Sequence, residues 1–193
     1  MTKFQISNRA KTIRLFRKIH RSSGLILLVF ILNVAITGIL LGWKKNSADL
    51  ILPKTQKGST SDLSQWLPLD SLEKVAGIAL HQTVSAELSL KIARIDARKQ
   101  EGIVKFVYFD HYWGVQMDAA TADVLQIRKR RSDFLEQLHD ASYLDRYFGF
   151  ENDYFKLFFT SLMGLALLLF SITGFWMWYG PKQIRKAKSI QKK

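Results

Sequence analysis

Histidines are the side chains of this sequence best suited to hold a metal. There are four, His20, His81, His111 and His139, and there is no cysteine. The lack of cysteine excludes disulfides, thiolate clusters and covalent haem attachment, so a haem here would need non-covalent binding through histidine or methionine. No nucleophile–base pair, pair of carboxylates, or flavin or nucleotide motif is recognisable. The sequence therefore does not support hydrolysis.

Two apolar stretches must position these side chains. Residues 24–43 form an uncharged run of twenty residues, and a helix of that length spans about 30 Å, the hydrocarbon thickness of a bilayer. The run is too long for a secretory signal peptide and ends Leu-Gly-Trp-Lys-Lys without a cleavage site. A second uncharged run covers residues 157–179, before Gly180-Pro181. We expect two membrane spans, the first an uncleaved anchor.

The net charge of +13 lies at the two ends of the chain. Residues 1–21 carry seven basic side chains and no acidic one, the segment 181–193 carries six basic ones, and the rest is balanced. This distribution disfavours nucleic-acid binding and favours anionic lipid headgroups. By the positive-inside rule both termini are cytoplasmic and residues 44–155 lie outside.

Small and polar residues occur inside both spans. Ile-Thr-Gly lies near the C-terminal end of each span, at 36–38 and 172–174, and the pairs Gly38/Gly42 and Ser171/Gly174 allow close helix contact. The threonines can hydrogen-bond locally or across helices, and Asn33 should find its partner on another helix.

The outer region predicts a helix on a small antiparallel sheet. Asp70 or Ser71 would begin the helix, and strand-like runs follow at 90–96, 102–109, 113–117 and 123–127. The expected core is Val75, Ile78, Ala79, Ile92, Val104, Phe106, Tyr108 and Val115. A further amphipathic helix is expected over 133–147.

Several of these residues resemble a known family. Residues 115–125, Val-Gln-Met-Asp-Ala-Ala-Thr-Ala-Asp-Val-Leu, resemble the last hairpin of a PepSY domain, with Ala122 where the family usually has glycine. Residues 17–24, Arg-Lys-Ile-His-Arg-Ser-Ser-Gly, resemble the opening of the PepSY-associated transmembrane family, and Leu138-His139 resembles its second motif. The resemblance covers nearly the whole chain. Larger members have about four spans and include haem-containing inner-membrane reductases of ferric siderophores.

The resemblance implies a haem b ligand at His20. Gly24, one turn later, leaves the surface beside the imidazole bare, and Arg17 and Arg21 are near enough to meet haem propionates. The alternative is an ordinary interfacial histidine among basic residues.

His139 is the candidate ligand of an outer haem, with Arg130, Arg131 or Arg146 as propionate partners. The alternative is a hydrogen bond to Asp140 or Glu136. His81 and His111 are expected to be structural or solvated.

His20 and His139 belong to opposite leaflets, about 30 Å apart, so they cannot hold one haem within a protomer. A second axial ligand must then come from another chain. A two-fold homodimer would pair each histidine with its symmetry mate, and a subunit of a larger membrane complex is the alternative.

The resulting fold class is a membrane protein with two transmembrane helices flanking a small extracytoplasmic α+β, PepSY-like domain. The expected segments are the basic segment 1–21, first span 22–43, linker 44–65, domain 66–130, interfacial helix 131–153, second span 154–180 and basic tail 181–193. We expect a protein of the bacterial inner membrane that passes electrons to a periplasmic acceptor in an iron- or siderophore-related process. The alternative is a non-enzymatic anchored interaction module, an accessory subunit of an envelope or transport complex.

Overall fold

A computed structural model describes residues 3–190 of the chain. The terminal residues 1–2 and 191–193 lie outside the described residues, and with them Lys192 and Lys193 of the basic tail. The chain divides into two compact units. Residues 1–37 and 138–193 form the helical unit, and residues 38–137 form the outer unit.

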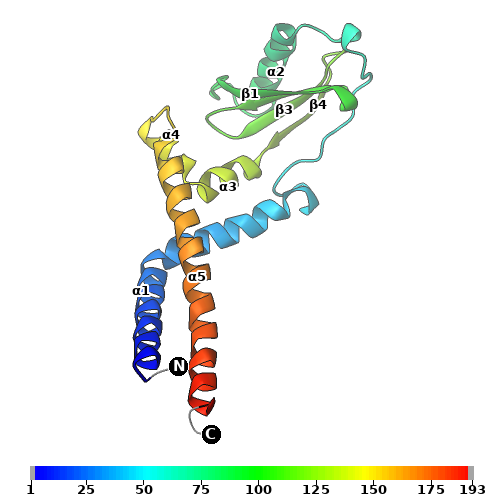
Figure 1. Ribbon diagram of the computed structural model, residues 1–193. Helices are drawn as coiled ribbons and strands as arrows, with labels where there is room; N and C mark the ends of the chain where they lie inside the picture. Colours follow the sequence, from blue (N-terminus) through cyan, green and yellow to red (C-terminus); the bar gives the residue numbers. More distant parts are fainter. Residues whose placement is uncertain (1–2, 191–193) are drawn as a thin grey trace. The chain divides into compact units, whose positions relative to one another are not determined.

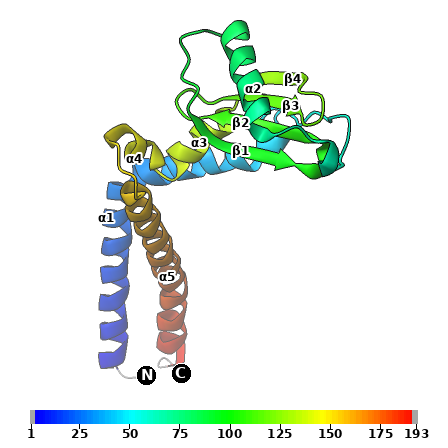
Figure 2. The ribbon, with the colours of Figure 1, turned by 90° about the horizontal axis from the view of Figure 1, so that it is seen from above.

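Two long helices dominate the helical unit. Helices α1 (Lys3–Gly42) and α5 (Tyr154–Ile190) are antiparallel, and the first part of α1 lies beside α5 (Figures 1 and 2). Ring pairs join them, with centroids 6.4 Å apart for Phe16 and Trp176 and 5.9 Å apart for Phe30 and Phe159. Large apolar side chains elsewhere on both helices are exposed, as at Leu25, which is 75% exposed. Such an apolar surface suits lipid rather than water.

Both helices extend beyond the apolar spans. The basic segment continues into α1 without a break, and α5 passes through Pro181 to Ile190 instead of ending at Gly180-Pro181. The helix continues through this dipeptide because one proline removes only one helical hydrogen bond, and the lysines, glutamine and alanine that follow favour helix.

Close helix contact occurs at a different glycine from those expected. A Cβ at Gly180 would lie 2.6 Å from Ile13 Cδ1, whereas a Cβ at Gly42 or Gly174 would meet no atom within 4 Å. Within the protomer, Gly42 and Gly174 therefore face open space and take no part in close helix contact.

The segment expected as one amphipathic helix is divided. Helix α3 (Arg131–His139) and helix α4 (Ser142–Phe148) are separated at Ala141, whose φ is 62°. The Asp140 carboxylate accepts hydrogen bonds from the backbone N–H of Ser142, at 3.0 Å, and from its hydroxyl, at 2.6 Å. An aspartate that bonds the amide two residues later favours a new helix start over continuation.

The outer unit is a helix on a four-stranded sheet, as expected. The strands β1 (Ile92–Arg98), β2 (Ile103–Tyr108), β3 (Trp113–Asp118) and β4 (Val124–Lys129) are antiparallel in sequence order. Helix α2 (Leu69–Thr83) lies over one face of this sheet (Figures 1 and 2).

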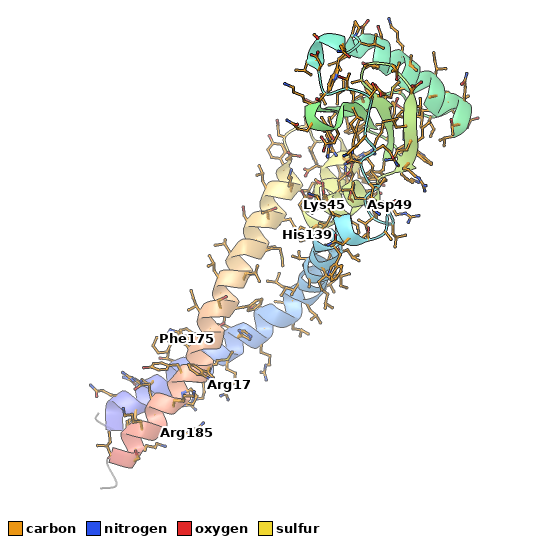
Figure 3. The ribbon with its side chains drawn as sticks, turned by 90° about the vertical axis from the view of Figure 1, so that its right-hand side faces the viewer. Arg17, Lys45, Asp49, His139, Phe175 and Arg185 are labelled. Atoms are coloured by element: carbon orange, nitrogen blue, oxygen red, sulfur yellow. The ribbon has the colours of Figure 1, made fainter. Side chains whose placement is uncertain are left out.

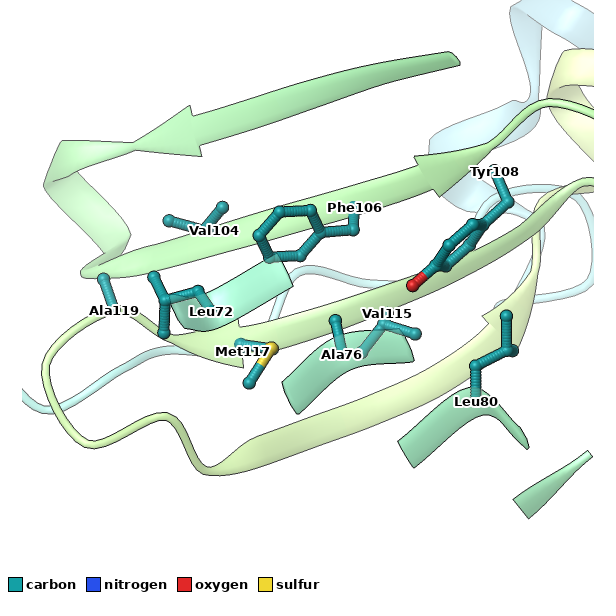
Figure 4. Packing of buried hydrophobic residues seen from close by; sticks show 9 residues of the cluster. All are labelled: Leu72, Ala76, Leu80, Val104, Phe106, Tyr108, Val115, Met117 and Ala119. Carbon is teal, nitrogen blue, oxygen red and sulfur yellow. The ribbon is translucent and has the colours of Figure 1, made fainter. Parts of the chain in front are cut away.

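The core lies between α2 and that face of the sheet. Figure 4 shows side chains of α2 against those of β2 and β3; the cluster comprises Leu72, Ala76, Leu80, Val104, Phe106, Tyr108, Val115, Met117 and Ala119. The expectation was right for the strands and wrong for part of the helix, since Val75 is 38% and Ile78 is 58% exposed. The helix follows Pro68 as its N-cap, instead of Asp70 or Ser71. Its buried line runs through Leu72, Ala76 and Leu80, which are spaced by four and so lie on one face of the helix.

The hairpin that resembles the PepSY motif is built on Asp118. Its carboxylate accepts hydrogen bonds from the N–H groups of Ser59, at 2.6 Å, Ala120, at 2.9 Å, and Thr121, at 3.2 Å. Burial alone would raise the pKa of this carboxyl, but these donors more than offset it and hold the pKa below its usual value. Ala122 has a φ of 62°, the left-handed conformation that suits glycine, at a cost of roughly 1 kcal/mol.

The linker that precedes α2 packs on the other face of the sheet through polar contacts. Gln116 on β3 accepts from the N–H of Gln56, at 3.1 Å, and donates to the carbonyl of Lys54, at 3.1 Å. A Cβ at Gly58 would lie 2.1 Å from the carbonyl oxygen of Gly102, so this approach requires glycine. The linker is irregular, as expected, and it covers one side of the domain.

Candidate cofactor site

His20 lies on α1 and faces α5. Its Nδ1 is 2.8 Å from the hydroxyl oxygen of Thr173, and its ring meets the ring edge of Phe170 with centroids 5.0 Å apart. Thr173 is almost fully buried, at 2% exposed, whereas the His20 side chain is half-buried. The histidine is thus held from one side and open on the other.

The Thr173 hydroxyl decides which nitrogen of His20 carries the proton. This hydroxyl is 2.7 Å from the carbonyl oxygen of Leu169, one turn earlier on α5, and donates its single proton there. Toward His20 it can only accept, so the pattern assigns the proton of the neutral imidazole to Nδ1. The Nε2 lone pair has no partner among the described residues and is available to a metal.

His139 repeats this arrangement within the same unit. Its Nδ1 is 2.8 Å from the hydroxyl oxygen of Thr37, and that hydroxyl donates to the carbonyl of Asn33, at 2.5 Å. The same reasoning places the proton on Nδ1 and leaves Nε2 free. Asn33 donates in turn to the carbonyl of Leu138, at 2.9 Å, so it finds its partner on another helix as expected.

The two sites are related by the Ile-Thr-Gly motifs. Thr37 and Thr173 are the central residues of these motifs, and each binds the histidine that lies next to the other span. Sequence reasoning identified the histidines and the motifs separately and missed their pairing. The available signal was one histidine before each apolar span and one threonine near the end of each span.

The surroundings of His20 leave space beside its ring. A Cβ built on Gly24 would meet no atom within 4 Å, and the side chains of Arg17 and Arg21 are exposed. Figure 3 shows Arg17 and Arg185 at one end of the helix pair and His139 at the other. Gly24 and the arginines are therefore compatible with a flat ligand that carries carboxylates.

The two carboxylates considered as alternative partners of His139, those of Glu136 and Asp140, bond other groups. Glu136 pairs with Lys44 at 2.7 Å, and Asp140 accepts from Ser142, so neither carboxylate holds the imidazole. Two of the proposed propionate partners are also engaged, Arg130 by Asp133 at 2.9 Å and Arg131 by the carbonyl of Leu50 at 3.2 Å. Arg146 also has an interaction partner.

The remaining histidines bond backbone carbonyls of the outer unit. Nε2 of His81 is 2.8 Å from the carbonyl oxygen of Leu88, and Nε2 of His111 is 2.9 Å from that of Ser89. These contacts agree with the structural roles expected for both.

His20 and His139 cannot share one iron. His20 and Thr37 are seventeen residues apart on α1, a helix length of about 25 Å, and His139 is bonded to Thr37. Two nitrogens bound to one metal lie only about 4 Å apart, because each metal–nitrogen bond is close to 2 Å. No group of three or more metal-ligating side chains occurs within residues 3–190. Each histidine is therefore a single candidate ligand.

A family model, described as the PepSY-associated TM region, matches residues 17–193. The match runs from the arginine one turn before His20 through both helices and the outer domain. The chain belongs to this family. A search of curated proteins finds no match. As a member of the PepSY-associated TM family the chain is a membrane protein, with α1 and α5 long and apolar enough to cross the bilayer.

Proposed function

We propose that this PepSY-associated TM protein binds haem b through His20 and His139 and carries electrons across the membrane. The observation that carries the proposal is the contact of each histidine Nδ1 with a buried threonine hydroxyl that already donates to a backbone carbonyl. This pattern assigns the proton to Nδ1 and leaves Nε2 without a partner among the described residues. Histidines that ligate metals characteristically donate their other N–H to a neighbouring acceptor, which orients the ring. An ordinary interfacial histidine could bond water or lipid headgroups and would not require a buried threonine to orient its ring.

The chain's own residues have distinct parts in this proposal. Thr173 and Thr37 hold the imidazole rings in orientation, Gly24 leaves room beside His20, and Arg17 and Arg21 supply charge for propionates. Haem, when bound, supplies one-electron transfer. The electron donor in this proposal is a separate protein or a quinol. A periplasmic ferric chelate is the acceptor class that the family suggests.

The proposal includes a homodimer. Each protomer offers one histidine at each site, and axial ligation by two histidines needs a second chain. In a two-fold dimer His20 would meet His20 of the second copy, and His139 would do likewise. A partner subunit of a membrane complex would satisfy the same requirement.

The second candidate function is an anchored interaction module without haem. The exposed Val75 and Ile78 on α2 give the outer domain an apolar surface that a partner could cover. A reduced-minus-oxidised visible spectrum of protein purified from haem-replete cells, with its lipids retained, decides between the two functions. A colourless protein would exclude haem binding and favour the interaction module.

We place the protein in the bacterial inner membrane with both termini cytoplasmic and the outer domain periplasmic. Because the chain has no cysteine, the single substitutions Glu87→Cys and Arg185→Cys, both at exposed positions, can report this topology. A membrane-impermeant maleimide should label Glu87→Cys in intact spheroplasts and Arg185→Cys only after the membrane is opened. The opposite pattern would reverse the orientation.

The hydroxyl of Thr173 provides a direct test of the histidine arrangement. Thr173→Val keeps the branched shape but removes the acceptor of the Nδ1 proton, and we expect haem affinity at His20 to fall about 10–100-fold. Thr173→Ser keeps the hydroxyl and should retain haem. Titration of the apoprotein with haem, followed by absorbance, measures both. Equal haem affinities for the valine and serine variants would contradict the proposed role.

A further inference from the structure

The outer unit contains a basic cavity on the face of the sheet opposite to α2. The cavity has a volume of about 310 Å³, which is within the range of small-molecule sites. Its polar lining comprises Lys45, Lys54, Thr55, Arg98, Lys105 and Arg130. No aspartate or glutamate lines it.

Lys105 is the most unusual member of this lining. It lies on β2 between two core residues, is only 3% exposed, and donates from Nζ to the hydroxyl of Thr55 at 2.6 Å. Its cross-strand neighbour Asp96 is paired with Arg94, at 3.3 Å. No carboxylate within residues 3–190 lies at ion-pair distance from Lys105. A buried lysine without a counter-charge is costly and therefore needs an explanation.

The electrostatics of the cavity agree with this geometry. Burial, and after it the nearby positive charges of Arg98 and Arg130, lower the pKa of Lys105 to about 8, against Asp96 and Glu101, which raise it. Asp96 and Glu101 thus stabilise the ammonium only in part, and neither lies at ion-pair distance from it.

The other cations are only partly neutralised. Arg98 donates to the same Thr55 hydroxyl, at 3.4 Å, and its nearest carboxylate, Glu101, is 4.0 Å away. Arg130 is bound by Asp133 through two hydrogen bonds, at 2.9 and 3.1 Å. Lys45 and Lys54 are exposed, and the described part of the chain shows no carboxylate paired with either side chain. Two cations therefore share one neutral hydroxyl, with two more exposed cations beside them.

We propose that this cavity binds a small oxyanion with two or more negative charges, carried by phosphate or carboxylate groups. Lys105 and Arg98 would donate to its oxygens next to Thr55, and Lys45 and Lys54 would attract it electrostatically. The site is separate from both histidines, and the proposal does not depend on haem.

Isothermal titration calorimetry on the full chain in phosphatidylcholine nanodiscs, at low salt, tests this site. The probes are pyrophosphate and citrate, and both should bind saturably. Lys105→Met keeps the length of the side chain but removes its charge, and we expect affinity to fall at least about tenfold, because a charge-assisted hydrogen bond is lost. The matched control is Lys74→Met, the same change at a lysine on α2, which is 77% exposed; it should bind like the unmodified protein.

The titration of Lys105 gives a second readout. A bound anion stabilises the ammonium and so raises its pKa above the free value of about 8. At about pH 6.5 the Lys105 amine of the free protein is already protonated, so binding should take up almost no proton. As the pH rises to about 9 the free amine loses its proton, so uptake on binding should approach one proton per site. Affinity should decline over the same range. Repeating the calorimetry in buffers of different ionisation enthalpy measures the uptake, and Lys105→Met should abolish it.

Two further arms keep the test decisive. If Lys105→Met does not fold, Arg98→Gln at the exposed edge of the cavity should still weaken pyrophosphate binding several-fold. Nanodiscs with added cardiolipin, a lipid whose headgroup carries two phosphates, distinguish the sources: competition with pyrophosphate at the cavity would identify a lipid headgroup, and no competition a soluble anion. Absence of saturable binding to either probe would overturn the proposal. Equal losses in Lys105→Met and Lys74→Met would overturn it as well, since binding would then follow overall charge.

Discussion

His20→Ala is expected to abolish one low-spin haem signal of the purified protein and to leave the signal from His139 intact. The other three histidines lie elsewhere, and helix geometry separates His20 from His139 by about 25 Å. Alanine leaves the Thr173 hydroxyl bonded to the carbonyl of Leu169, so α5 should keep its structure. A reduced-minus-oxidised spectrum, with the haem-to-protein ratio, measures the loss.

The same substitution should weaken the dimer, because the ligand bonds at that site would join two chains. Chemical cross-linking in lipid, before and after removal of haem, measures this effect. His81→Ala is the matched control, since His81 bonds the carbonyl of Leu88 within the outer domain and should alter neither haem nor dimerisation. An unchanged spectrum in His20→Ala would exclude this residue as a ligand.

Phe106→Ala should produce the largest loss of stability in the outer domain. Phe106 is fully buried between α2 and the sheet, and removing a buried phenylalanine ring costs about 3–5 kcal/mol. That is a large share of the roughly 5–15 kcal/mol that stabilises a typical domain. Trp66 and Trp113 pack against the same cluster, so urea unfolding followed by tryptophan fluorescence reports the change.

Val75→Ala is the control for this prediction. Val75 lies on α2 but is 38% exposed, so its truncation should change the unfolding free energy by about 0.5 kcal/mol or less. Comparable losses in the two variants would show that the core is not where the structure places it.

Local patterns were sufficient to predict the two long helices and the strands. Uncharged runs of about twenty residues identify spans wherever they occur, because lipid demands apolar side chains all round. Alternation around Val104, Phe106 and Val115 likewise predicted the buried face of β2 and β3. The buried line of α2 was harder, since Leu72, Val75, Ala76 and Ile78 are all apolar or small and only packing selects among them.

For the candidate sites too, some features follow from the sequence and others from the tertiary structure. The sequence by itself determined which residues are available: a histidine beside each span, no cysteine, and basic ends that predict a topology. Only the tertiary structure decided that Thr37 and Thr173 receive the protons of His139 and His20, because each pair lies more than a hundred residues apart in the chain and meets through antiparallel helix packing. It also decided that Lys105 lies in a basic cavity without a carboxylate at ion-pair distance, because the linker and the far face of the sheet enclose it only after folding.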